Sequence, residues 1–536
     1  MPCGRRDRDR GGIGVAWASA ERDTAFRPIR RSRPMATTTS AARLLSGWAA
    51  IGLLASGCGE PTSTRSVDVK VTSPSATLAA SIAVPGTVTP ALAQLLSSAS
   101  ASDSLFVVVG YDEQATSGAA VAQKVMDVGA GARALQQLPF VGALGTPSQI
   151  AAIAGLPGVT SVSENRRLHY LSRSSALLAM FRFLDESVPT IKADQARARY
   201  GVSGRGIGVA ILDSGIDGLY QQDVGFPGRT VQNLKVLVNQ ADIVCFKGLP
   251  CAGSIYIENL PNSETSVGHG THVSGIAGGN GSMSGGLYTG VAPGSNLIGI
   301  GTGDILFIFW ALAGFDYILQ NQDRYNIKVV NNSWGTSGAF DPKDPINIAT
   351  KQVTKRGITV VFAAGNDGPD QNTLNPYSVA PWVIGVAAAC SATDTLAQRV
   401  HCQPGGHLAD FSSRGIPGDP LYHPTVTAPG VHVISTRAST GTVLNGSDAP
   451  HDFDLTSSCG MRQEFVTFYT CASGTSMASP HVTGVVALMQ ERAGGRLTPA
   501  QVRKLLIQTA DPMAGYATFE VGAGMVNALN AVGRSK

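Results

Sequence analysis

Between residues 206 and 388 the chain repeats one pattern, a short apolar run rich in Val and Ile that ends in Gly or a small polar residue. The runs cover residues 206–215, 234–239, 296–301, 327–335, 357–366 and 382–388, and helix-like stretches at 305–321 and 345–356 lie between some of them. Continuous apolar strands that alternate with helices are typical of a parallel sheet with both faces covered. The sequence therefore predicts an α/β fold, with a parallel sheet flanked by helices on both faces.

Polar side chains stand where three of these runs end. Asp213, Ser333 and Asn366 follow apolar stretches of different runs. In open α/β sheets the carboxyl ends of the strands form the edge at which ligands bind. We therefore expect these three residues to meet at one functional site.

Charge excludes two classes of partner. The formal net charge of +4 comes from residues 1–34, which hold nine Arg against four acidic residues, and the remainder is close to neutral. A basic surface for nucleic acid or anionic lipid is therefore not expected. The apolar content of 43% and the 63 Gly suit a globular protein with many tight turns.

The N-terminal region has the pattern of an export signal. Residues 35–58 place one Arg before a short apolar run and small residues, which is the pattern of a signal peptide. Residues 1–34 are interpreted as a start-site artefact, with translation beginning at Met35. The ending Ala55-Ser56-Gly57-Cys58 resembles a lipobox, in which Cys58 carries a lipid anchor, and ordinary signal cleavage is the alternative. Export makes the protein secreted, extracellular or periplasmic, with the lipoprotein precursor held at the membrane.

Two segments follow before the repeated pattern. Residues 59–103 are rich in Ser, Thr, Ala and Pro and are interpreted as a flexible linker. Residues 104–170 suggest strands at 105–109, 135–141 and 159–163 and helices at 119–128 and 147–155, the second with Thr146 and Gln149 as a capping box. The order βαββαβ, with its last strand unassigned, predicts a small ferredoxin-like α+β unit.

Six cysteines of the later chain fall as three close couples. An even number at short spacing in an exported chain indicates disulfides, and these spacings do not match zinc knuckles. Six cysteines allow fifteen connectivities, and pairing between neighbours is our hypothesis, with buried free thiols as the alternative. The six are Cys245, Cys251, Cys390, Cys402, Cys459 and Cys471.

Four motifs carry a family resemblance. The segments 209–217, 268–275 and 474–484 contain Asp213, His269 and Ser476, and 363–366 reads Ala-Ala-Gly-Asn. Together, in this order, they resemble the subtilisin-like serine proteases, the subtilase family, over residues 188 to 532 or so. The resemblance implies a serine endopeptidase with Asp213, His269 and Ser476 as catalytic triad and Asn366 as oxyanion donor. No cofactor is required for that chemistry.

The chemistry needs these residue types. A serine hydroxyl is a weak nucleophile until a neighbouring base takes its proton, and His269 fits that role for Ser476. Asp213 would fix the imidazole tautomer. Taken singly, each residue also fits a turn or a helix cap. For three other polar residues near the motifs, Asp217, His272 and His481, we expect structural roles.

The resemblance also implies binding sites. The segment Ser333, Trp334 and Gly335 would pair with the substrate backbone. Ala363, Ala364 and Gly365 would line the pocket for the residue before the scissile bond. Structural calcium is common in such proteins, and Asp223 and Asn280 are candidate ligands, with solvated loop residues as the alternative.

The resemblance further implies a self-processing zymogen. Residues 104–170 correspond to a pro-domain that blocks the cleft as an intramolecular inhibitor, 171–187 to a linker with the processing site, and 188–536 to the catalytic domain. We expect a monomer that cuts proteins or peptides. Two other functions remain open, an inactive subtilase fold that serves as a binding protein, and a peptide ligase or cyclase that uses the same triad.

Overall fold

The computed structural model describes residues 86–171, 187–237, 239–249, 253–391, 407–440, 443–444 and 461–536. The predictions for residues 1–34, for the signal peptide at 35–58 and for Cys58 fall outside the described residues. Within the described part, no helix is both long enough and apolar enough to cross a membrane.

The N-terminal unit, defined here as residues 86–164, is built on an antiparallel four-stranded sheet with the order β2-β3-β1-β4. Its elements in chain order are α1 (Pro90–Ser98), β1 (Leu105–Tyr111), α2 (Gly118–Asp127), β2 (Gly131–Ala134), β3 (Phe140–Gly145), α3 (Pro147–Ala154) and β4 (Val159–Glu164). Helices α2 and α3 share one core with one face of the sheet. From β1 to β4 the order is the βαββαβ of the ferredoxin-like prediction, and Thr146 and Gln149 form the expected capping box.

The predicted strand at 135–141 is wrong. Most of this stretch is the connection between β2 and β3. The backbone N–H groups of Gln136, Gln137 and Leu138 donate to the carboxylate of Asp316, which lies about 180 residues further along the chain. Backbone groups that are bound by a distant carboxylate cannot join a strand ladder, and nothing local in the sequence reports that contact.

The predicted linker at 59–103 is wrong for its last part. Helix α1 begins after Thr89, whose hydroxyl accepts a hydrogen bond from the backbone N–H of Leu92. Leu92 and Leu96 are buried in the core of the N-terminal unit, and Val88 pairs with Val162 of β4. Apolar residues four apart on a capped helix give it a buried face, which outweighs the linker-like composition around it.

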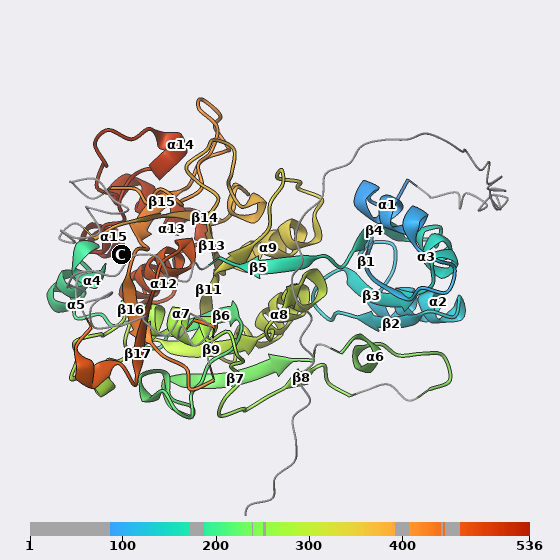
Figure 1. Cartoon of the computed structure of the whole chain (residues 1–536), viewed down its shortest axis with the longest axis horizontal. Coiled ribbons are helices and arrows are strands. Elements are labelled where there is room, and N and C mark those ends of the chain that lie inside the picture. The colour runs from blue at the N-terminus through green and yellow to red at the C-terminus, as the bar shows by residue number, and fades with distance from the viewer. Residues whose placement is uncertain are drawn as a thin grey trace, which may run out of the picture. The chain divides into compact units, whose positions relative to one another are not determined.

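The main sheet has eight strands among the described residues, in the order β15-β14-β13-β11-β6-β9-β7-β8 (Figure 1). The strands are β6 (Gly208–Asp213), β7 (Thr230–Val236), β8 (Tyr256–Ile257), β9 (Asn296–Gly301), β11 (Ile327–Asn332), β13 (Thr359–Ala363), β14 (Ile384–Ala389) and β15 (Val426–Pro429). All neighbours pair in parallel except β7 with β8. The predicted parallel sheet is confirmed.

Helices cover both faces of this sheet. Val209 and Ile211 of β6 belong to a core that includes residues of α7 (His269–Gly278), α12 (Thr475–Arg492) and α15 (Ala528–Arg534). Ala210 and Leu212, which alternate with them, belong to a second core that contains α8 (Ile308–Asn321) and α9 (Pro345–Lys355). Successive side chains of a strand point to opposite faces, so the alternation explains why every residue of β6 is buried.

Smaller elements complete the chain. They are β5 (Arg167–Tyr170), α4 (Ser187–Thr190), α5 (Ala193–Tyr200), α6 (Gln240–Ile243), β10 (Leu306–Phe307), β12 (Trp334–Gly335), β16 (Val433–Thr436), β17 (Tyr469–Ala472), α13 (Pro499–Thr509) and α14 (Thr518–Val521). Strand β5 lies between β10 and β12 in a separate small sheet. The helix predicted at 305–321 begins only at Ile308 because the two residues before it pair with β5.

Candidate active site

Asp213 and His269 are brought together by a strand end and a helix start. Asp213 is the last residue of β6, and His269 is the first residue of α7. His269 Nδ1 lies 2.7 Å from Asp213 Oδ1, and both side chains are fully buried. A carboxylate on Nδ1 fixes the ring so that Nε2 is the nitrogen that exchanges a proton.

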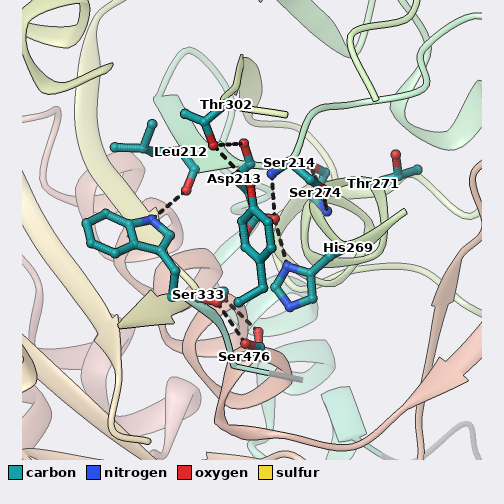
Figure 2. A network of polar contacts seen from close by, with 12 residues as sticks. Leu212, Asp213, Ser214, His269, Thr271, Ser274, Thr302, Ser333 and Ser476 are labelled. Carbon is teal, nitrogen blue, oxygen red and sulfur yellow. Dashed lines mark hydrogen bonds and ion pairs between the residues drawn. The ribbon is translucent and has the colours of Figure 1, made fainter. Parts of the chain in front are cut away.

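Ser476 lies on the side of the ring to which Nε2 points (Figure 2). It is the second residue of α12, at the N-terminus of that helix, as the sequence predicts. Its hydroxyl donates to the carbonyl oxygen of Ser333 at 2.9 Å, and His269 Nε2 is buried with no hydrogen-bond partner in the described part of the chain. The serine hydroxyl therefore points to Ser333 rather than to the base.

Asn366 and Ser476 converge on one carbonyl oxygen. The side-chain amide of Asn366 donates from Nδ2 to the oxygen of Leu171 at 2.7 Å, and the backbone N–H of Ser476 donates to the same oxygen at 3.3 Å. Asn366 Oδ1 accepts from the N–H and the hydroxyl of Thr475, at 2.9 and 2.8 Å, which orients the amide. Two donors aimed at one oxygen can stabilise negative charge as it develops there.

The residues before Leu171 form the middle strand of a three-stranded antiparallel sheet. We call residues 167–171 the cleft strand. On one side β12 pairs Trp334 with Tyr170 and Gly335 with His169, and the N–H of Leu171 donates to the oxygen of Ser333 at 3.1 Å. On the other side β10 pairs Leu306 with Leu168. The segment 333–335 thus pairs with an extended chain through its backbone, while the Trp334 ring is buried in the core.

Tyr170 covers the imidazole. Its ring centroid lies 5.3 Å from that of His269. Its hydroxyl donates to the oxygen of Gly303 at 2.7 Å and lies 3.0 Å from the hydroxyl of Thr302. Burial, with the charge of Asp213 adding to it, raises the pKa of Tyr170 well above its ordinary value, so the hydroxyl keeps its proton.

Thr302 and Gly303 are missed by the motif analysis. They come directly after β9, which pairs with β6 in register from Gly208 to Asp213. Ligands bind at the carboxyl ends of parallel strands. This rule, applied to the run at 296–301, would have indicated Thr302 and Gly303.

Ala363, Ala364 and Gly365 lie at the end of β13, directly before Asn366. Both alanines are fully buried. Gly365 has φ of +116°, and a Cβ there would lie 2.5 Å from Ser413 Oγ, so this position requires glycine. Their contact with a substrate side chain remains a prediction.

Glu264 is another residue that the sequence analysis missed. Its Oε2 accepts hydrogen bonds from the N–H and the hydroxyl of Thr271, both at 2.8 Å, and its Oε1 accepts from the N–H of Thr265 at 2.9 Å. Burial raises its pKa to about 7. Because Thr271 lies in the first turn of α7, Glu264 supports the helix start that carries His269.

His272, His481 and Asp217 have contacts that suit the structural roles we expect. His272 Nε2 lies 3.2 Å from the oxygen of Val433, and His481 Nδ1 lies 2.8 Å from the oxygen of Met477. Burial lowers the pKa of His272 to about 3 and that of His481 to about 4, so both rings are neutral near pH 7. Asp217 accepts hydrogen bonds from the N–H groups of Tyr220 and Ser439.

The side chains of Asp223 and Asn280 accept hydrogen bonds from other protein groups, and their role as calcium ligands stays a prediction. The carboxylate of Asp223 is buried and accepts from the hydroxyls of Ser282 and Tyr469 and from the N–H of Met283. Asn280 Oδ1 accepts from the N–H of Ser282. Calcium takes six to eight oxygen ligands, and no group of three or more His, Cys, Asp or Glu side chains in the described ranges could hold a metal. We therefore derive no role for calcium at these residues.

The disulfide pairing stays a prediction. Cys245, Cys390 and Cys471 are buried. Their expected neighbours Cys251, Cys402 and Cys459 lie outside the described residues.

Comparison with known proteins identifies the relatives of this chain. The model of the subtilase family matches residues 204–526. The chain is 30% identical to serine protease AprX of Bacillus subtilis over 398 residues, which cover 71% of this chain and 77% of that protein. It is 34% identical to an extracellular protease of Xanthomonas campestris over 298 residues, 54% of this chain and 42% of that protein. The crystal structure of fervidolysin from Fervidobacterium pennivorans, at 22% identity, shares the fold with a TM-score of 0.55 over 80% of this chain and 61% of that one.

Proposed function

The chain belongs to the subtilase family of serine proteases, and we propose that it is a secreted endopeptidase that works through Asp213, His269 and Ser476. One observation carries the proposal. A peptide carbonyl, that of Leu171, accepts hydrogen bonds from Asn366 Nδ2 and from the Ser476 N–H, directly beside the Asp213–His269 pair. A bound peptide held in this way presents its carbonyl carbon to the serine.

The proposed reaction begins with a rotation of Ser476. A change of χ1 between staggered positions turns its hydroxyl from Ser333 toward Nε2 of His269. His269 then takes the proton while Oγ attacks the carbonyl carbon, and Asn366 and the Ser476 N–H stabilise the oxyanion. The protonated ring gives its proton to the leaving amine. Water, activated by the same ring, hydrolyses the acyl-enzyme, and Asp213 stabilises the imidazolium in both steps.

We also propose that the protein is a self-processing zymogen. The N-terminal unit and the cleft strand would act as an intramolecular inhibitor, since the cleft strand occupies the backbone partners that a substrate needs. Cleavage would fall between Tyr170 and Val188. Export through the segment 35–58, disulfides and a lipid anchor on Cys58 before processing belong to the same proposal. An extracellular relative supports the secretion.

The test uses the chain expressed from Met35 and its Ser476→Ala variant. The wild type should shorten itself to the size of the catalytic domain and digest casein, and the variant should do neither, with a loss of roughly 10⁶-fold as in subtilisin itself. Ser479→Ala, one turn further along α12, is the matched control and should keep most of the activity. Casein hydrolysis by Ser476→Ala at the wild-type rate would overturn the proposal.

A further inference from the structure

The cleft strand has the backbone contacts of a substrate, residue by residue. Leu171 donates its N–H to Ser333, and its oxygen accepts from Asn366 and Ser476. Arg167 and Leu168 pair with β10, and His169 and Tyr170 pair with β12. A strand that only covered the cleft would not need its last carbonyl placed between the two donors beside the nucleophile.

The side chains of the cleft strand alternate between buried and exposed. Leu168 is 2% exposed and lies in the core cluster that contains Leu306, whereas Arg167 and His169 face solvent. Tyr170 points inward, to Thr302 and Gly303. Alternate side chains of an extended strand share one face, so Leu168 and Tyr170 contact the catalytic domain through their side chains while Arg167 and His169 do not.

The contacts of Tyr170 are selective for a phenol. Its hydroxyl donates to the oxygen of Gly303, and the hydroxyl of Thr302 also lies within hydrogen-bond distance. Phenylalanine would fill the same space but would leave the oxygen of Gly303 without this donor in a partly buried place. A site built to bind a hydroxyl discriminates against the analogue that lacks it, because the polar partners of the site are then left unpaired.

We infer that the chain cuts itself on the carboxyl side of Leu171, and that Thr302 and the carbonyl of Gly303 form a subsite that selects tyrosine one residue before the cut leucine. This rests on the proposed function. In the step, Ser476 Oγ bonds to the carbonyl carbon of Leu171, and the C–N bond to the next residue breaks. The serine proton passes through His269 to the released amine. Water then frees the Leu171 carboxylate and restores the Ser476 hydroxyl.

The first test reads the cut directly. The wild-type full chain is allowed to process itself, and the mass of the released N-terminal fragment gives its last residue, with Ser476→Ala as the unprocessed control. We expect the fragment to end at Leu171. An active enzyme whose fragment ends at another residue would overturn the inference and leave the proposed function standing.

The second test measures the tyrosine subsite. The probes are acyl-Leu-His-Tyr-Leu-aminocoumarin and the same peptide with Phe in place of Tyr. For the wild type we expect kcat/KM for the Tyr peptide to exceed that for the Phe peptide ~10-fold, the size of one buried hydrogen bond. In Thr302→Val the ratio should fall to ~3, because only the Gly303 partner remains.

Each variant is judged by its ratio of kcat/KM for the Tyr peptide to kcat/KM for the Phe peptide, so a general loss of activity cancels. This includes a loss caused by breaking the contact between Thr302 and the backbone of Asp213. Equal rates for both peptides in the wild type, or an unchanged ratio in Thr302→Val, would contradict the subsite. Failure to cut either peptide or casein would instead count against the proposed function.

Discussion

The N-terminal unit and the catalytic domain bury very different groups. Within the described residues, the N-terminal unit buries one polar side chain, Ser163, in an otherwise apolar core. The catalytic domain buries many polar and charged ones, among them Asp213, His269, His272 and His481. Burying a charged side chain is costly unless it is paired, so a fold retains buried charges where function or a hydrogen-bond network requires them. The difference between the two regions therefore indicates that the reaction takes place in the catalytic domain.

The polar contacts of the N-terminal unit lie at its edge instead. Arg166, just beyond the unit, forms ion pairs with Glu164 and with Asp344 of the catalytic domain, at 3.4 and 2.7 Å. The loop after β2 donates three backbone N–H groups to Asp316. Four predictions test this difference between an N-terminal unit that binds to the catalytic domain and a catalytic domain that carries out the reaction.

The largest difference in activity should be between variants of two buried histidines of α7, His269 and His272. His269→Ala removes the base and should lower kcat by roughly 10⁶-fold, as in subtilisin. His272→Gln, one turn further along the same helix, keeps a donor for Val433 and should stay within ~10-fold of the wild type. Steady-state hydrolysis of a chromogenic peptide measures both. Equal losses of activity in the two variants would show that any change of a buried histidine in α7 lowers activity and that His269 is not the catalytic base.

Removal of the oxyanion donor comes next. Asn366→Leu keeps the bulk of the side chain but cannot donate, and kcat should fall by ~10²–10³, again the size known for subtilisin. KM should change little, because the donor acts mainly on the transition state. A rise in KM with kcat unchanged would assign Asn366 to substrate binding alone.

Protonation of buried histidines should destabilise the catalytic domain as the pH falls from ~6.5 to about 4, whereas residues 86–164 of the N-terminal unit contain no histidine. Burial lowers the pKa of His481 to about 4, below the ~6.5 of an unfolded histidine, so the folded state binds fewer protons. The stabilisation is therefore present above pH ~6.5 and is lost as the pH falls toward about 4, by up to about 3 kcal/mol. His272 acts in the same direction, whereas Glu264, whose pKa is raised to about 7 by burial, acts in the opposite direction, so the contribution of His481 is read from its own variant.

This loss can be followed by the tryptophan fluorescence of urea unfolding in the Ser476→Ala variant, which does not digest itself. Residues 86–164 contain neither Trp nor His, so the signal of Trp310, Trp334 and Trp382 reports the catalytic domain. His481→Gln should flatten the decline between pH 6.5 and 4. A decline that stays the same in His481→Gln would remove the buried ring as its cause.

The smallest effect concerns docking. Asp316→Ala leaves three backbone N–H groups of the N-terminal unit without their acceptor, so the cleaved unit should leave the catalytic domain ~10-fold faster. The lag between self-cleavage and casein hydrolysis measures this release. Asp323→Ala, an exposed carboxyl just beyond the end of α8, is the control and should not shorten the lag.

The features that could be predicted from the sequence are those that depend on the pattern of neighbouring residues. Apolar periodicity predicted strands β6, β7, β9, β11, β13 and β14 and helices α8 and α9, but not the edge strands β8 and β15. The meeting of Asp213 with His269 follows from motifs at a strand end and a helix start. The contacts missed by the sequence analysis join distant segments. Asp316 binds the loop before β3 across about 180 residues, and Leu171 meets Asn366 across 195. No pattern near Leu171 marks it as the residue between two oxyanion donors.

The contacts of the candidate calcium ligand Asp223 also join distant segments, and its role as a ligand stays a prediction. Asp223 stands near the expected position in the sequence, but Tyr469 and Ser282, far along the chain, supply the donors that its carboxylate needs. The contrast with Asp213 is informative. One Oδ of Asp213 accepts from the His269 ring and the backbone N–H of Ser214, and the other has no hydrogen-bond partner among the described residues.

The most direct measurement labels the nucleophile. A fluorophosphonate reacts only with a serine that a neighbouring base activates, and peptide mass mapping identifies the modified residue. The account predicts one adduct, on Ser476 of the processed wild type, and none in His269→Ala. An adduct on another serine, or casein hydrolysis that continues with Ser476 unmodified, would contradict it.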